Sequence, residues 1–132
     1  MAHRHLAVFL KGVAEKILSG DKKVEIRLSK SRVLPYLSIS KDDEILLKSS
    51  GGKIIGKTFV ENALFYDHLT PSMVEALKKV HFEDAAMDGS FWESRMDAKF
   101  ATVIFLKNSQ KFITPIAYRK NDRRAWLIIE DK

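Results

Sequence analysis

Apolar and charged residues alternate in the stretch KVEIRL, which covers positions 23–28. Such period-two alternation predicts a β-strand with one face against a core and the other face polar. The charged face is either a solvated stripe of alternating charge or part of a binding site, and the spacing leaves both open. The apolar face carries Val24, Ile26 and Leu28, and the charged face carries Lys23, Glu25 and Arg27.

Three further elements lie around this strand. Positions 5–10 (HLAVFL) are apolar and predict a strand buried on both faces. Apolar residues at helical spacing over 13–18 predict a short helix, and Gly20 supplies the left-handed residue that commonly ends one. Positions 34–43 contain a proline and several short polar residues, so they predict a loop.

The clearest hairpin signal is the pair Gly51-Gly52, which tolerates positive φ between two β-rich runs. The runs are EILLKSS, at 44–50, and KIIGKTFVENALFYD, at 53–67. Gly56 interrupts the second run, which indicates a bulge or bend there.

The second half of the chain predicts two helices and two strands. Thr70 followed by Pro71 predicts a helix start, and Ser90 with Glu93 has the spacing of a capping box for a second helix. The segments 99–106 and 124–130 predict strands, which a basic stretch over 107–124 connects. The apolar stripe of the first helix is Met73, Val74, Leu77 and Val80.

The resulting fold class is α+β, a barrel-like sheet of about six strands with three short flanking helices. A chain of 132 residues is long enough for one hydrophobic core, so residues 1–132 are expected to form a single domain, with a monomer favoured. No apolar run approaches the roughly 20 residues that cross a bilayer, and there are no cysteines. We therefore expect a cytoplasmic protein without a membrane partner.

The net charge of the chain indicates which classes of partner to expect. The formal net charge of +6 favours polyanions such as nucleic acid, although many small proteins are basic without binding any. The histidines lack zinc-like spacing and no phosphate-binding glycine loop is present, so we expect no metal and no cofactor.

Four residues within and just before the strand at 23–28 form the pattern G-x-K-x-x-E-x-R: Gly20, Lys22, Glu25 and Arg27. With the acidic turn Asp42-Asp43 and the glycine hairpin that follows, this order resembles the ASCH domain, a β-barrel of the PUA-like superfamily. The resemblance covers Leu6 to about Tyr66. The later segment SFWESRMDAKFATVIFL resembles small archaeal proteins of unknown function related to this superfamily.

The resemblance implies a module that binds RNA, or a modified nucleobase within it, in a cleft beside the signature strand. It also leaves open an amidohydrolase acting on a modified nucleoside such as N4-acetylcytidine. Lys22 matches the catalytic lysine of that subgroup, but Glu25 stands where its threonine is expected. In this alternative Glu25 would be the general base and Lys22 would stabilise the oxyanion. A small-molecule or protein-binding module with an incidental basic surface is the third possibility.

Several residues outside the signature are also candidates for ligand contact. Trp92 could stack on a base or belong to the core, Tyr66 could stack or form the rim of the barrel, and the cations could bind phosphate or be solvated. With the signature strand, the full candidate set is Lys22, Lys23, Glu25, Arg27, Tyr66, Trp92, Arg95, Lys99, Arg119, Arg123 and Arg124.

Overall fold

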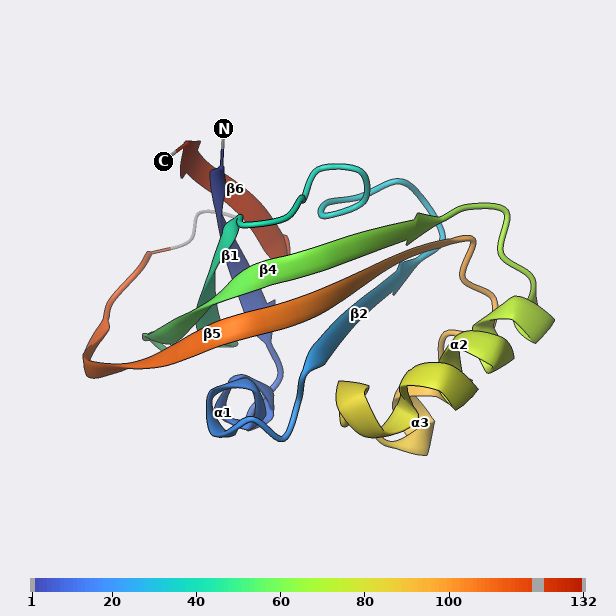
Figure 1. Cartoon of the computed structure of the whole chain (residues 1–132), viewed down its shortest axis with the longest axis horizontal. Coiled ribbons are helices and arrows are strands. Elements are labelled where there is room, and N and C mark those ends of the chain that lie inside the picture. Colours follow the sequence, from blue (N-terminus) through green and yellow to red (C-terminus); the bar gives the residue numbers. More distant parts are fainter. Residues whose placement is uncertain (1, 120–122, 132) are drawn as a thin grey trace.

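A computed structural model describes residues 2–119 and 123–131 of the chain. In this part of the chain six strands and three helices follow the predicted order (Figure 1). The strands are β1 (His3–Phe9), β2 (Val24–Ser29), β3 (Glu44–Ser49), β4 (Ile54–Tyr66), β5 (Phe100–Ile116) and β6 (Trp126–Asp131). The helices are α1 (Val13–Ser19), α2 (Pro71–Ala85) and α3 (Gly89–Glu93), and none of the described helices is long and apolar enough to span a bilayer.

All six strands belong to one sheet in the order β2-β5-β4-β3-β1-β6. Neighbouring strands are antiparallel except β1 and β3, which are parallel. The sheet curls into a half-barrel, with α1 below one end of the long β4–β5 pair and with α2 and α3 beside β2 (Figure 1). Because β2 pairs only with β5 and β6 only with β1, the barrel has an open seam between its two edge strands.

Two of the predicted turn signals are confirmed, and one is corrected. Gly20 ends α1 in the left-handed region with φ 88°, and the Thr70 side chain accepts from the Met73 N–H at the start of α2. The N-cap of α3 is Asp88, whose carboxylate accepts from the Phe91 N–H, and not Ser90. Ser90 instead donates its hydroxyl to Asp88.

The apolar residues form two clusters, one between α1 and the curled sheet and one between α2, α3 and the other face of β2 and β5. In α2 the predicted stripe is right for Val74 and Leu77 but wrong for Met73 and Val80, which are exposed. His81 is buried on the same side of α2 as Val74 and Leu77. The side of the helix that meets β2 and β5 is therefore rotated slightly from the predicted stripe, and the His81 ring contacts Phe105 on β5.

β5 is much longer than predicted. The expected connection over 107–124 is strand as far as Ile116, because β4 extends beside it and supplies hydrogen-bond partners for a polar segment. Gly56 lies at a register shift in β4, as predicted, and a Cβ there would lie 2.6 Å from the Gln110 carbonyl oxygen. The close β4–β5 approach at this point therefore requires glycine.

Candidate functional site

The open seam contains a cavity of about 890 Å³, which we call the seam cleft. Its walls come from β1, β2 and the start of β6, with further residues from the loop 33–35, the β3–β4 turn and the α2–α3 region. Most of its side chains are apolar. Among the described residues, its charged lining consists of one acid, Glu25, and five cations, Arg27, Lys48, Arg95, Arg123 and Arg124.

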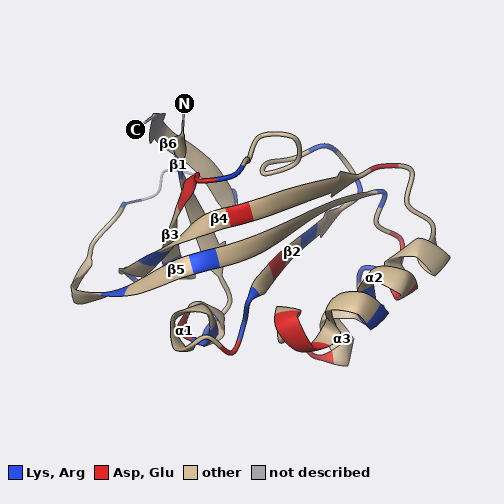
Figure 2. Ribbon diagram, viewed as in Figure 1, with Lys and Arg blue, Asp and Glu red and all other residues tan. Residues whose placement is uncertain are grey.

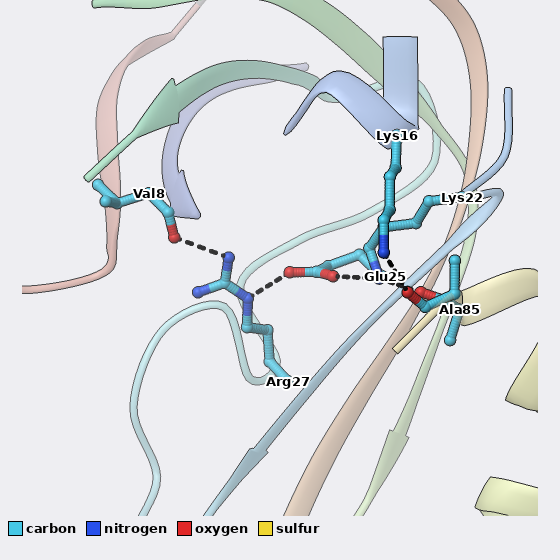
Figure 3. Close-up of polar contacts among 7 residues, drawn as sticks. Val8, Lys16, Lys22, Glu25, Arg27 and Ala85 are labelled. Carbon is cyan, nitrogen blue, oxygen red and sulfur yellow. Dashed lines mark hydrogen bonds and ion pairs between the residues drawn. The ribbon is translucent and has the colours of Figure 1, made fainter. Parts of the chain in front are cut away.

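Glu25 lies at the centre of an ion cluster on the face of β2 that points into the seam (Figure 3). One carboxylate oxygen is 3.0 Å from Lys22 Nζ, and the other accepts from Arg27 Nε at 2.6 Å. The charged face of β2 is therefore not a uniformly solvated stripe (Figure 2): Lys23 is exposed, whereas Glu25 is buried and Arg27 is half-buried. Lys22 also donates to the Ala85 carbonyl at the end of α2.

Opposing effects set the pKa of Glu25. Burial of the carboxyl favours its neutral form and by itself would raise the pKa. The charges and hydrogen bonds of Arg27 and Lys22 outweigh burial, so the pKa lies below its ordinary value. Glu25 is consequently a stable carboxylate near neutral pH, suited to holding cations in place and poorly suited to general-base catalysis.

Arg27 joins the two edges of the seam. Its Nη2 donates to the Val8 carbonyl on β1 at 3.2 Å, and its guanidinium lies over the rings of Phe9 and Trp126, 5.1 and 5.0 Å from their centroids. Nη1 has no hydrogen-bond partner among the described residues. Arg27 is thus held in one orientation, with a donor left for a ligand in the cleft.

A buried hydrogen-bond chain fixes the indole beside Arg27. Trp126 Nε1 donates to His5 Nδ1 at 2.9 Å, and His5 Nε2 lies 2.8 Å from the Asp43 carboxylate. Because an indole nitrogen only donates, Nδ1 must be the acceptor and the ring proton lies on Nε2. Asp43 also accepts from the backbone N–H groups of His3 and Ser40. This hydrogen-bond chain therefore fixes the position of the Trp126 ring in the wall of the cleft.

The free energy of unfolding is expected to decrease as pH falls from 6.5 toward 5. Burial holds the pKa of His5 and of His81 below 6.5 in the folded protein, so protons bind the unfolded chain first. The slope is at most about 1.4 kcal/mol per pH unit for each histidine. Glu25 adds nothing in this range, because its lowered pKa matters only below about pH 4.5, where the unfolded carboxyl protonates.

Urea unfolding at pH 7.5, 6.5, 5.5 and 5.0 would measure this dependence. His81→Gln should remove one of the two contributions and retain the other, so it is the control variant. A stability that is constant or that rises between pH 6.5 and 5.0 would contradict the assignment of a neutral buried His5.

Several predicted ligand residues lie elsewhere than expected. Lys22 has a side chain with no exposed surface beneath Glu25, and Lys23 is exposed but does not line the cleft. Trp92 is completely buried within the second core cluster, which favours the core alternative that the sequence left open beside stacking. Tyr66 packs against the same cluster, because the end of β4 lies over it.

The predicted cations fall into two groups. Arg95 lines the cleft and lies over the Phe91 ring at 4.3 Å, and Arg123 and Arg124 line it at the start of β6. Lys99 and Arg119 are exposed and are not among its lining residues. Lys99 does not share a helical face with Arg95, because α3 ends at Glu93. The rest of the basic run, 120–122, lies outside the described residues.

Three important residues of the cleft were not predicted: Lys48, Phe9 and Trp126. Each lies in a strand whose sequence pattern predicts buried core positions and gives no sign of a binding site. Lys48 carried the one available signal, since it is a lysine that directly follows the apolar run Ile45–Leu47 in β3. Within the described ranges no three acidic or histidine side chains gather in the manner of metal ligands.

Solved structures with the same fold are found among ASCH proteins. ASCH from Zymomonas mobilis superposes with a TM-score of 0.75 at 19% identity, covering 97% of this chain and 88% of that one. A more distant similarity, with a TM-score of 0.51 at 12% identity, joins 89% of this chain to 78% of the N-terminal domain of Staphylothermus marinus McrB. No protein-family model and no curated protein matches the sequence.

The chain therefore has the α+β half-barrel fold of the ASCH domain, as its signature strand predicted. The seam cleft lies beside the strand that carries G-x-K-x-x-E-x-R, and Glu25 and Arg27 of that pattern line it.

Proposed function

We propose that this protein is a nucleic-acid-binding module that receives one base of an RNA chain, or a modified base, in the seam cleft. The observation that carries the proposal is the placement of Arg27 over two aromatic rings in a mostly apolar cavity whose described lining holds five cations and one acid. Apolar walls suit the faces of a base, and the cations suit its phosphates. The ASCH-type fold is consistent with this role.

The β2 edge supplies groups able to read a base. Lys23 and Ser29 direct their carbonyls toward β5, where they accept from Leu106 and Lys99. Because main-chain groups alternate along a strand, those of Ile26 and Leu28 point the other way, into the seam. Both residues line the cleft. A base in the seam would thus meet fixed N–H and C=O groups as well as Arg27.

The amidohydrolase alternative has less support. Lys22 is sealed beneath Glu25 and cannot reach a substrate oxygen, and the pKa of Glu25 is lowered, which weakens it as a base. Incubation with N4-acetylcytidine should therefore release no cytidine above the level of a Glu25→Gln control.

Arg27→Met is expected to weaken binding of a short single-stranded RNA by about 10- to 100-fold, the effect of losing a charged hydrogen bond. Lys22 still neutralises Glu25 in this variant, so the cluster keeps a balanced pair. Fluorescence anisotropy at about 50 mM salt, where electrostatic binding is strong, would measure it.

Lys23→Met is the matched control, because it removes one positive charge from the same strand outside the cleft. Its affinity should stay within about threefold of the native protein. Absence of RNA binding by the native protein, or equal losses in the two variants, would contradict the proposal.

A further inference from the structure

Lys48 is a buried cation without a counter-charge. Its residue is only 6% exposed, and its ammonium donates to the Ser49 carbonyl at 3.3 Å. It forms no ion pair with any carboxylate of the described residues. Burying a charge is unfavourable unless an opposite charge compensates it, so this position indicates a missing anion.

The acid in the cleft cannot supply that compensation. Both oxygens of Glu25 are already occupied, one by Lys22 and the other by Arg27. Arg95 and Arg123 add further positive charge to the same cavity. No other carboxylate of the described residues lines the cleft, which leaves a ligand to supply the charge that completes this group of cations.

Lys48 and the Nη1 donor of Arg27 belong to the same cleft. It is paired with Val8 across β1 and β3, and the Val8 carbonyl accepts from Arg27 Nη2. Both cations line the cleft, and Nη1 of Arg27 has no partner within the described chain. An ammonium and a guanidinium N–H around one hollow are the donors that a phosphate oxygen group accepts from.

We infer that Lys48 and Arg27 form a phosphate subsite inside the seam cleft, so that its ligand is a nucleotide and not a neutral nucleoside. This inference rests on the proposed function and specifies its ligand class. The cavity volume of about 890 Å³ is within the range of small-ligand sites and suits a single nucleotide unit, with the ring against the apolar wall and the phosphate at Lys48.

Isothermal titration of the full chain with the four ribonucleoside 5′-monophosphates, and separately with the four nucleosides, would test the subsite. We expect at least one monophosphate to bind more than tenfold more tightly than its nucleoside. Lys48→Met should reduce that ratio to below about twofold while leaving nucleoside binding unchanged. Lys53→Met, an exposed lysine of the same hairpin outside the cleft, should keep the native ratio.

Lys48→Met should also unfold at the same temperature as the native protein or a higher one, because it removes an uncompensated buried charge. Equal affinities for nucleotide and nucleoside, no binding of either, or an unchanged ratio in Lys48→Met would each overturn the subsite. If RNA still bound with dependence on Arg27, the proposed function would stand without it. If RNA binding were also absent, both would fall.

Discussion

Replacing Glu25 by glutamine is expected to lower the free energy of unfolding by about 3–5 kcal/mol. The carboxylate is the only partner of opposite charge that Lys22 has among the described residues, and the Lys22 side chain has no exposed surface. Glutamine keeps the shape but removes the charge, so an ammonium remains buried beside a neutral amide. Urea unfolding at pH 7 would measure the loss.

Two comparison variants make this prediction specific. Asp97→Asn breaks the exposed Lys30–Asp97 pair and should leave the free energy of unfolding nearly unchanged. The double variant Lys22→Met with Glu25→Gln removes both buried charges and should recover a large part of the stability lost by Glu25→Gln. Additive losses in the double variant would show that the ion cluster is not the coupled unit described above.

Trp92→Ala is expected to destabilise the protein by about 3–5 kcal/mol, the usual effect of removing a large buried aromatic side chain. Trp92 has no exposed surface and fills the core between α2, α3 and the sheet. Trp92→Phe should cost well under half as much, because Nε1 has no hydrogen-bond partner within the described residues and the ring of phenylalanine still fills most of the space.

The same pair of variants separates a core role from a binding role. Chemical unfolding would give the stability of both, and RNA affinity would be measured on Trp92→Phe, the variant expected to remain well folded. An affinity equal to that of the native protein is expected. A large loss of RNA affinity in a stable Trp92→Phe protein would contradict a purely structural role and would show that Trp92 contributes to binding.

The proposed binding site also contributes to the stability of the seam. The Arg27 guanidinium connects β2 to the Val8 carbonyl on β1, where the sheet itself does not close. The Glu25 carboxylate, the two aromatic rings and the chain from Trp126 through His5 to Asp43 hold it there. Such preorganisation reduces the entropy lost when a ligand binds. The seam is thus an opening in the sheet that side chains, and not main-chain pairing, hold together.

Local patterns in the sequence determined the elements of this protein. The alternation in KVEIRL, the Gly51-Gly52 hairpin and the Thr70 cap each depend on residues a few positions apart, so each is readable without the fold. The same locality explains the errors. The Asp88 cap competed with an equally plausible Ser90, and the length of β5 depended on β4, which lies far away in the chain.

The tertiary structure alone decided how the site is built. Sequence pattern placed Lys22, Glu25 and Arg27 together, but only the curled sheet and the end of α2 bury Lys22 and leave Arg27 facing a cavity. Trp126 and His5 are 121 positions apart in the sequence and form a hydrogen bond. Lys48 lines the same seam cleft from a strand whose pattern predicts buried core residues. Periodicity records which face of an element is buried, whereas a site depends on which distant faces meet, and that is set by the packing of the whole chain.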